Sequence, residues 1–270
     1  MCRRPLIRYH GGKWKLSDWL ISNLPDHRVY VEPFSGAASV LLKKPRSTVE
    51  VINDKCSEIT NLFSVVRDRG SELQRQLELT PYSRDEFDLS YQASDDPLER
   101  ARRLVVRASL GRSSASSSKS AKATFRAYTG IKRKSAVQDW VNYPAALEAI
   151  ISRLKGVIIE NKDALGVMSS HDHTDTVHYV DPPYLSSTRD AGGDYRFEMS
   201  DAEHESLGSF LANLKGMVVL SGYESDLYND LYRGWRKVRK KTHADGAVGR
   251  VEVMWLSPNC ISHAPVDMFG

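Results

Sequence analysis

The sequence predicts an α/β fold in which a doubly wound sheet carries an inserted helical domain. Two observations support this prediction. Short apolar runs alternate with helical patterns in the N-terminal and C-terminal parts of the chain, as in a sheet with helices on both faces. Between about residues 67 and 149 the alternation stops, and helix-like stretches follow one another. With 270 residues, 41% of them hydrophobic, the chain is long enough to bury such a core.

Five apolar runs, each bounded by polar or glycine-rich turns, are typical of buried parallel strands. They are Val29–Glu32, Val49–Asn53, Val157–Glu160, Val177–Val180 and Met217–Leu220. Helical patterns lie between most of them, at Lys15–Leu24, Ser57–Arg69 and Asp201–Leu214. Ser200 stands three positions before Glu203, which is the spacing of a capping box at the start of the last helix.

The C-terminal part of the chain changes pattern. Two β-rich runs, Trp235–Thr242 and Arg250–Ser257, flank a loop that contains Asp245 and Gly246. Glycine favours a turn, so we expect an antiparallel hairpin at the edge of the sheet.

The interrupting segment predicts a separate helical unit. Its clearest helix is Asp96–Leu110, where Pro97 suits the first turn. We therefore expect a catalytic domain formed by residues 1–66 and 150–270, with residues 67–149 as an inserted domain. Arg100, Arg103 and Arg107 recur at a spacing that places them on one face of this helix.

The charge distribution indicates a surface that binds a polyanion. The net charge is only +4, but residues 100–138 hold eleven Lys or Arg and no Asp or Glu, which leaves −7 on the rest of the chain. Such a segment fits a nucleic-acid phosphate backbone, although a solvated basic face would look the same. The candidate DNA-binding residues are Arg100, Arg103, Arg107, Arg112, Lys119, Lys122, Arg126, Lys132, Arg133, Lys134 and, in a later loop, Tyr195.

Several classes of protein are disfavoured. No apolar run approaches the roughly 20 residues that span a bilayer, and the N-terminal segment turns polar too early for a signal peptide. We expect a cytoplasmic protein with no membrane association and no obligate protein partner. Cys2, Cys56 and Cys260 are far apart, which predicts free thiols. No metal is expected, because the histidines, among them His10, His171, His173 and His178, lack ligand spacing.

The strongest chemical signal is Asp181-Pro182-Pro183-Tyr184, directly after an apolar strand. Ligands of open α/β sheets bind beyond the carboxyl ends of strands. An exocyclic amine on a heteroaromatic ring is a poor nucleophile, and a carboxylate with a backbone carbonyl can accept its N–H bonds. Asp181 and Pro182 would supply these acceptors, and Tyr184 a flat face for an unstacked base. A rigid turn at the end of a strand is the alternative.

A second signal leaves the first strand and enters a helix, at Val31–Ser39. Small residues there allow a ligand to approach the backbone, and Gly36 can adopt a positive φ. A single glycine disfavours a pyrophosphate loop, so the cofactor should lack phosphates. Asn53 and Asp54 end the second strand, where an acidic side chain can hold ribose hydroxyls. Each feature alone is equally compatible with an ordinary strand-helix turn.

Together these residues resemble the Dam-like, D12-class (α-group) DNA adenine methyltransferases. The resemblance rests on five segments in order: Tyr9-His10-Gly11-Gly12-Lys13, Glu32-Pro33-Phe34-Ser35-Gly36, Asn53-Asp54, Lys162-Asp163-Ala164 and Asp181–Tyr184. It implies a class I, Rossmann-like fold with a seven-stranded mixed sheet and an inserted helical target-recognition domain. It also implies direct SN2 transfer of a methyl group from S-adenosylmethionine to N6 of a flipped adenine, with S-adenosylhomocysteine as product and no metal.

The resemblance also assigns residues. The catalytic residues would be Asp181, Pro182, Pro183 and Tyr184. Tyr9 and Lys13 would line the methionine end of S-adenosylmethionine, Asp54 would bind the ribose and Asp163 the adenine amine. The full set of expected cofactor-binding residues is Tyr9, Gly12, Lys13, Glu32, Pro33, Phe34, Ser35, Gly36, Asp54, Asp163, Ala164 and Asp181.

The inserted segment departs from the family's pattern, because the asparagines expected near a GATC target are missing from residues 107–130. GATC specificity is therefore not predicted, and we expect relaxed or different site preference dominated by phosphate contacts. The loop Ser186–Arg196 is either a lid over the flipped base or an ordinary surface loop. Lys237–Lys241 either adds phosphate contacts or protects a sheet edge.

The sequence thus favours an adenine-N6 DNA methyltransferase, within or outside a restriction-modification system. N4-cytosine methylation is the alternative within the same chemistry, since cytosine presents a similar amine. A non-catalytic DNA-binding protein with a vestigial cofactor pocket is the alternative outside it.

Overall fold

The computed structural model describes residues 2–112, 123–127, 136–188, 196–243 and 249–260. It contains one seven-stranded sheet with the order β3-β2-β1-β4-β5-β7-β6. The strands are β1 (Val29–Glu32), β2 (Val49–Asn53), β3 (Ile158–Glu160), β4 (Thr176–Val180), β5 (Met217–Tyr223), β6 (Arg236–His243) and β7 (Gly249–Leu256). The first five in this order are parallel, and β7 pairs antiparallel with both β5 and β6. The predicted mixed α/β sheet is therefore confirmed.

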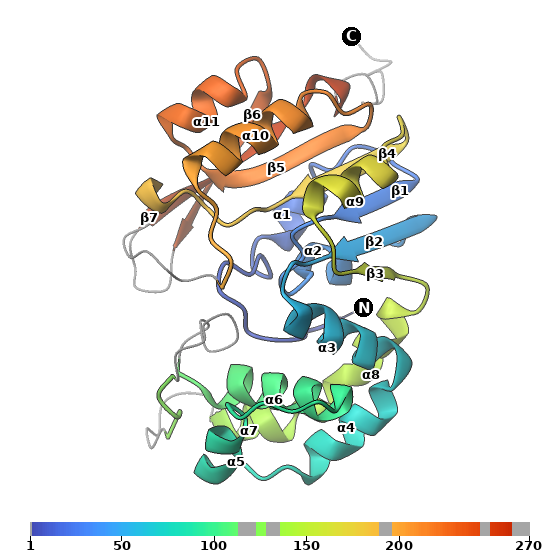
Figure 1. The fold of residues 1–270 in the computed structure, drawn as a ribbon, viewed down its shortest axis with the longest axis vertical. Coiled ribbons are helices and arrows are strands. Elements are labelled where there is room, and N and C mark those ends of the chain that lie inside the picture. Colours follow the sequence, from blue (N-terminus) through green and yellow to red (C-terminus); the bar gives the residue numbers. More distant parts are fainter. Residues whose placement is uncertain (1, 113–122, 128–135, 189–195, 244–248, 261–270) are drawn as a thin grey trace.

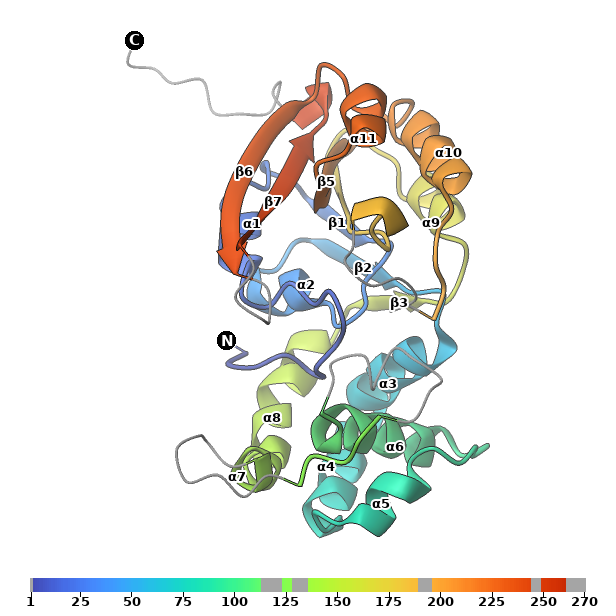
Figure 2. The same ribbon diagram turned by 90° about the vertical axis from the view of Figure 1, so that its left-hand side faces the viewer.

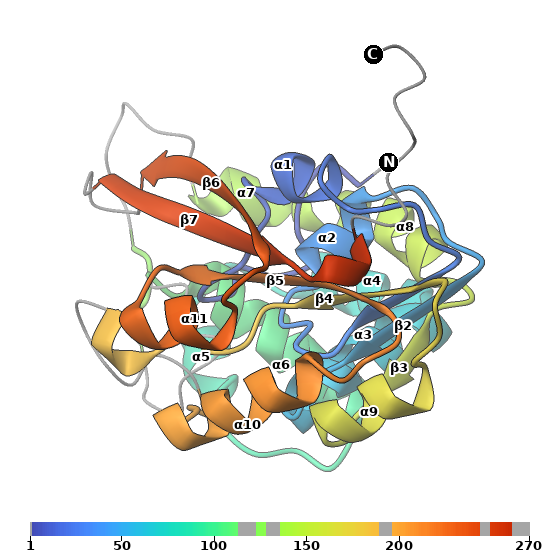
Figure 3. The same cartoon turned by 90° about the horizontal axis from the view of Figure 1, so that it is seen from above.

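Helices cover both faces of the sheet (Figures 1 and 3). On one face lie α9 (Ala164–Ser170), α10 (Asp201–Leu211) and α11 (Asp226–Leu231), and on the other lie α1 (Ser17–Ile21) and α2 (Ser39–Lys43). Strand β5 shows why: Met217 and Val219 join the hydrophobic cluster of the second face, while Val218 and Leu220 join that of the first. Alternating side chains of a buried strand point to opposite faces, so an apolar run needs cover on both sides.

The remaining helices gather at one end of the molecule, below the sheet in Figure 1. They are α3 (Ser57–Asp68), α4 (Gly70–Leu79), α5 (Arg84–Leu89), α6 (Pro97–Leu110), α7 (Ala136–Val141) and α8 (Tyr143–Leu154), and short 3-10 turns occur at Ser186–Thr188 and Pro258–Cys260. Figure 2 shows α8 running from this helical group back toward the sheet.

Local sequence explains where two of the helices begin. Asp96 caps α6 by accepting hydrogen bonds from the backbone N–H groups of Leu98 and Glu99, with Pro97 in the first turn. Ser200 and Glu203 form the predicted capping box at the start of α10.

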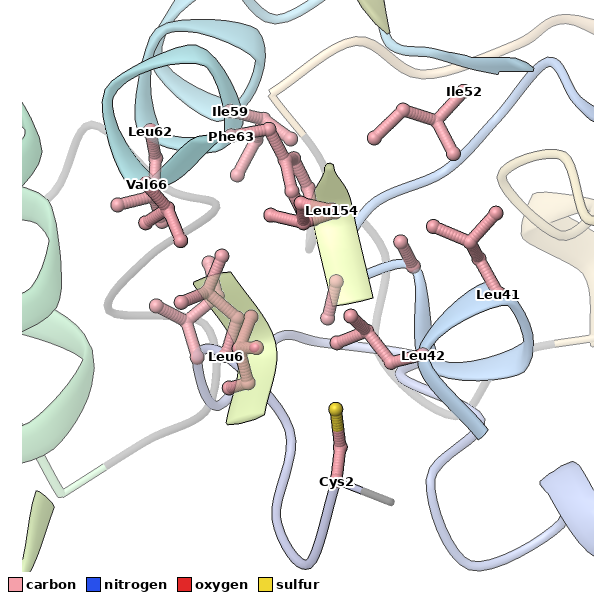
Figure 4. Packing of buried hydrophobic residues seen from close by; sticks show 14 of the residues in the cluster. Cys2, Leu6, Leu41, Leu42, Ile52, Ile59, Leu62, Phe63, Val66 and Leu154 are labelled. Atoms are coloured by element: carbon pink, nitrogen blue, oxygen red, sulfur yellow. The ribbon is translucent and has the colours of Figure 1, made fainter. Parts of the chain in front are cut away.

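The hydrophobic core runs without interruption from the sheet into the helical group. Figure 4 shows side chains of α2 (Leu41 and Leu42), α3 and α8 (Leu154), together with Leu6, in one cluster. Helix α3 continues to Asp68, so the predicted boundary at residue 66 lies within its last turn. The two-domain division stays a prediction; the helical group and the sheet share one core.

Two further features can be compared with the structure. Cys2, Cys56 and Cys260 are free and buried. Among the described residues, no helix has both the length and the apolar character needed to cross a membrane.

Candidate active site

A pocket opens at the carboxyl ends of β1, β2 and β4, where an open α/β sheet presents its loops. All twelve residues predicted to bind the cofactor line it: Tyr9, Gly12, Lys13, Glu32, Pro33, Phe34, Ser35, Gly36, Asp54, Asp163, Ala164 and Asp181. They come from five separate segments of the chain. The fold therefore brings the sequence motifs to one place.

Asn53, the last residue of β2, links three segments of the pocket wall by hydrogen bonds. Its side-chain amide donates to the carbonyl oxygens of Pro33 at 2.9 Å and Lys162 at 3.2 Å. Its side-chain oxygen accepts from the backbone N–H of Lys162 at 2.9 Å. Because Asn53 is buried, these bonds satisfy groups that water does not reach, and they fix the loops after β1 and β3.

Gly36 has a backbone conformation that favours glycine. Its φ is +46°, and a Cβ atom there would lie 2.9 Å from Cε1 of the Tyr9 ring. A side chain would therefore strain the turn and displace Tyr9 from the pocket wall.

Asp181 directly follows β4, and its closest contacts with described residues are made by one carboxylate oxygen. Oδ1 accepts a hydrogen bond from the hydroxyl of Ser221 at 2.8 Å and lies 2.9 Å from the ammonium nitrogen of Lys13. Ser221 in turn lies 3.1 Å from the hydroxyl of Tyr179, which also lines the pocket. The sequence indicated neither Ser221 nor Tyr179, because both stand within apolar strands.

Pro183 also lines the pocket, whereas Pro182 and Tyr184 are buried beside it. The Tyr184 hydroxyl donates a hydrogen bond to Glu252, and the Lys13 ammonium lies over the Tyr184 ring, 4.6 Å from its centre. Tyr223 meets the same ring edge-on. The open flat face predicted for Tyr184 is therefore not present in this conformation.

Glu32 is a buried carboxyl group in the pocket wall. It accepts hydrogen bonds from the Tyr30 hydroxyl at 2.9 Å and the backbone N–H of Leu41 at 3.3 Å. Burial raises the pKa of Glu32 to about 8, and the negative charge of Asp181 adds to the effect. The carboxyl is thus mainly protonated at neutral pH.

Two more carboxylates line the pocket and organise its backbone. Asp163 caps α9 by accepting from the backbone N–H groups of Leu165 and Gly166. Burial raises the pKa of Asp54, and hydrogen bonds from the backbone N–H groups of Cys56 and Gly36 partly offset this rise. Both residues remain placed to meet polar groups of a ligand.

Two buried hydroxyls at the pocket have no hydrogen-bond partner among the described residues. These are Oγ of Ser35 and Oγ of Ser39, and both residues line the pocket. An unsatisfied buried hydroxyl costs about 1–3 kcal/mol, so a polar ligand that reached either one would recover part of that cost.

Another wall of the pocket comes from residues 196–199, which connect the predicted loop Ser186–Arg196 to the predicted helix Asp201–Leu214. Arg196, Phe197, Glu198 and Met199 all line it, and the ammonium of Lys55 lies 5.6 Å from the centre of the Phe197 ring. Arg196 belongs to the predicted lid, Ser186–Arg196, but Tyr195 and the rest of residues 189–195 lie outside the described residues.

The arginines of α6 have protein partners in the structure. They were predicted to face DNA, yet Arg100 pairs with Glu58 at 2.8 Å and Arg103 pairs with Glu99 at 2.6 Å. Arg107 donates to the carbonyl oxygen of Ser90 at 2.9 Å. These guanidinium groups are partly satisfied by the protein itself, and their contact with DNA stays a prediction.

The basic residues after α6 differ from those within it. Arg112 is exposed, and Arg126 is half-buried. A β-bridge between Gly111 and Phe125 brings the two together, and Arg8, next to pocket-lining Tyr9, donates to the Arg112 carbonyl oxygen at 3.4 Å. The other candidates, Lys119, Lys122, Lys132, Arg133 and Lys134, lie outside the described residues.

On the β6 edge, Glu224 pairs with Arg239 at 2.8 Å and with Lys237 at 3.4 Å. These two cations of the predicted Lys237–Lys241 stretch are therefore partly neutralised. Within the described part of the chain, no three His, Cys, Asp or Glu side chains gather in a way that could hold a metal ion.

Comparison with known proteins assigns the chain to a family. Residues 9–244 match the D12 class N6 adenine-specific DNA methyltransferases. The chain belongs to this family. The DNA adenine methylases of Salmonella typhi and Salmonella typhimurium are each 31% identical to it over 105 residues, and that of Escherichia coli K12 is 32% identical. Each match spans 36% of this chain and 37% of the relative, so it covers little more than a third of either protein. Membership therefore rests on the family match, which includes every segment that lines the pocket.

Proposed function

We propose that this protein transfers a methyl group from S-adenosylmethionine to N6 of adenine in DNA. The observation that carries the proposal is the position of Asp181. It follows β4 at the pocket, and its contacts with Ser221 and Lys13 both involve Oδ1. The other oxygen, Oδ2, is the one we assign to an amino group of a base.

The lining of the pocket suits S-adenosylmethionine. Asp54 can accept hydrogen bonds from ribose hydroxyls and Asp163 from an adenine amine, while Ser35 and Ser39 offer unsatisfied hydroxyls. The loop after β1 has one glycine with a positive φ, not the glycine-rich turn of a pyrophosphate site. A cofactor with a nucleoside and an amino-acid end, and no phosphate, fits this set of donors and acceptors.

The chain's own groups would act on the target amine. S-adenosylmethionine supplies an electrophilic methyl group on a sulfonium. Asp181 and the carbonyl oxygen of Pro182 would accept the two N–H bonds of the adenine amine and so return electron density to nitrogen. Two consecutive prolines hold this acceptor pair in an extended backbone, which lowers the entropy lost on binding.

DNA is the proposed partner, and residues 100–138 hold eleven Lys or Arg and no Asp or Glu. Arg112 and Arg126 follow α6, and Arg8, next to pocket-lining Tyr9, donates to the carbonyl oxygen of Arg112. We assign phosphate contacts to these two residues and to the lysines around them in sequence. The target base would have to leave the helix to reach Asp181, at a cost of a few kcal/mol.

The decisive experiment is nucleoside analysis of unmethylated DNA incubated with the protein and S-adenosylmethionine. We expect N6-methyladenine. N4-methylcytosine would instead identify the alternative base, and no methylated nucleoside would contradict the proposal. Thermal stabilisation by S-adenosylhomocysteine serves as a parallel test, because a vestigial pocket would show no stabilisation.

The sequence context of the modified base is a separate question. Single-molecule sequencing of DNA from cells that express the protein would map every methylated position. We expect several related contexts, because the asparagines associated with GATC recognition are absent from residues 107–130. Methylation confined to one palindromic site at all expression levels would contradict relaxed specificity.

A further inference from the structure

Glu252 is a buried carboxyl group that reaches the active site from β7. Its neighbours in the strand, Val253 to Leu256, are buried apolar residues, so it is the acidic group in an otherwise apolar run. Its Oε1 accepts the hydrogen bond from the Tyr184 hydroxyl and lies 3.7 Å from the Lys13 ammonium nitrogen. No sequence motif pointed to it.

Lys13 lies between two carboxylates. Its ammonium nitrogen is 2.9 Å from Oδ1 of Asp181, 3.7 Å from Oε1 of Glu252 and 2.9 Å from the carbonyl oxygen of Gly11. Lys13 and Glu252 are both almost inaccessible to solvent. Burying such charges is costly unless each is paired, so these positions are mutually dependent.

The arrangement determines which oxygen of Asp181 is left for substrate. The closest contacts of Asp181 with Ser221 and Lys13 are both made by Oδ1, so we assign Oδ2 to the target amine. Glu252 limits how far Lys13 can move toward Asp181, because it attracts the same ammonium from the other side. It also anchors Tyr184, which follows the catalytic carboxylate by three residues.

We propose that Glu252 is a positioning residue for methyl transfer: it holds Lys13 and Tyr184 so that Asp181 presents Oδ2 to the target amine. This inference rests on the proposed methyltransferase function. Glu252 itself touches neither the base nor the cofactor, because it does not line the pocket. Its effect should therefore be larger on the rate of methyl transfer than on the binding of either substrate.

A double-mutant cycle between Glu252 and Lys13 tests the proposal. Glu252→Gln keeps the shape and a hydrogen-bond acceptor for Tyr184 but removes the charge that attracts Lys13. We expect its single-turnover methylation rate constant to fall by about tenfold, with dissociation constants for S-adenosylhomocysteine and DNA changed by less than about threefold.

The second arm of the cycle uses Lys13→Met. In that background we expect Glu252→Gln to reduce the rate constant by less than about twofold, because the ammonium through which Glu252 acts is gone. Equal reductions in both backgrounds would show that Glu252 acts independently of Lys13 and would overturn the proposal. An unchanged rate in Glu252→Gln would overturn it as well.

Glu50→Gln provides a matched control. Glu50 is equally buried and pairs with Lys44 at 2.9 Å and Arg153 at 2.5 Å, away from the pocket. We expect this variant to melt at a lower temperature but to keep the wild-type rate constant while folded, which separates loss of stability from loss of positioning.

Failure of the two proposals can be told apart. A wild-type protein that bound DNA without methylating it would refute the methyltransferase function. Normal wild-type methylation with an unaffected Glu252→Gln would refute the role of Glu252 alone.

Discussion

The backbone N–H of Gly36 donates a hydrogen bond to the carboxylate of Asp54, with 2.9 Å between the nitrogen and Oδ2. Gly36 belongs to the loop after β1 and Asp54 to the loop after β2, so this bond joins two walls of the pocket. The other oxygen of Asp54 accepts from the backbone N–H of Cys56 at 2.8 Å. The carboxylate predicted to hold a ribose therefore also sets the distance between the two loops.

Gly36→Ala should weaken cofactor binding, because a side chain at Gly36 would distort the turn that donates this hydrogen bond to Asp54. The new methyl group would meet the Tyr9 ring at 2.9 Å, in a backbone conformation that L-residues rarely adopt. We expect a loss of about 1–2 kcal/mol of stability and a smaller increase in melting temperature on adding S-adenosylhomocysteine. Differential scanning calorimetry with and without the ligand measures both.

Gly166→Ala is the matched control for this substitution. Gly166 lies in α9 with open space where a Cβ would project. Alanine is the better helix former by about 1 kcal/mol, so this variant should be slightly more stable and bind the ligand normally. A Gly36→Ala protein with an undiminished response to the ligand would contradict the role of the turn.

Asp181→Ala should abolish most methyl transfer while leaving DNA binding largely intact. The substitution removes the proposed acceptor of the amine and leaves the Lys13 ammonium without its closest carboxylate. We expect the single-turnover rate constant to fall by about a thousandfold, within the range that positioned acid-base groups contribute. Fluorescence anisotropy with labelled DNA checks that affinity persists.

Asp201→Ala, at an exposed acidic residue in the first turn of α10, serves as the control for removal of one negative charge. It should methylate DNA at nearly the wild-type rate. Appreciable activity in Asp181→Ala would exclude the proposed role of that carboxylate.

The strands of the sheet were predictable because burial on both faces requires continuous apolar runs. Val29–Glu32 and Val49–Asn53 begin and end where the sequence pattern does. Strand β5 extends three residues beyond the predicted Leu220, because Ser221 and Gly222 do not break the pairing with β7. The sequence of one strand alone does not show which of its polar residues can still pair with the neighbouring strand.

The pocket was predictable for a related reason. Parallel strands end at one edge of the sheet, so motifs that follow β1, β2 and β4 must meet there. Ser221 and Glu252 were missed because they lie inside strands, where one polar residue in an apolar run resembles a solvent-facing position. The face of the sheet to which each of these side chains points depends on the pairing of β5 with β7, which connects residues about thirty positions apart.

The arginines of α6 show the limit of helical periodicity. The spacing of Arg100, Arg103 and Arg107 groups side chains along one side of the helix, but it does not reveal what packs there. Glu58 arrives from α3 and takes up Arg100, while Glu99 of the same helix takes up Arg103. Charge counting along the sequence cannot separate internal ion pairs from a surface that binds phosphate.

Arg112→Ala should weaken DNA binding uniformly across sequences. Arg112 is exposed near the pocket, and a single phosphate contact contributes about one unit to the slope of log K against log salt. We expect the slope to become about one unit shallower. Titrations of labelled DNA at several salt concentrations measure it.

Arg75→Ala is the control, because Arg75 is an exposed arginine of α4 that only approaches Glu78 at 3.9 Å. Its slope should match that of the wild type. If Arg112→Ala also kept the wild-type slope, Arg112 would not be a phosphate contact.

His178 should make the fold sensitive to mild acid. It lies on β4, fully buried, with Oδ1 of Asp172 3.6 Å from its Nε2. Burial lowers the pKa of His178 to about 4. As the pH falls from about 6.5 to about 4, the unfolded chain protonates this histidine and the folded chain does not, so the contribution of His178 to stability decreases across this range and is constant above it. At pH 5 this contribution should be about 2 kcal/mol smaller than at pH 7.5, and comparison of the wild type with His178→Gln isolates it from Glu32 and other groups that titrate in both proteins. Urea denaturation of His178→Gln at the two pH values should show a correspondingly smaller difference, whereas His173→Gln, at an exposed histidine, should behave as the wild type. An unchanged pH dependence in His178→Gln would assign the acid sensitivity to other groups.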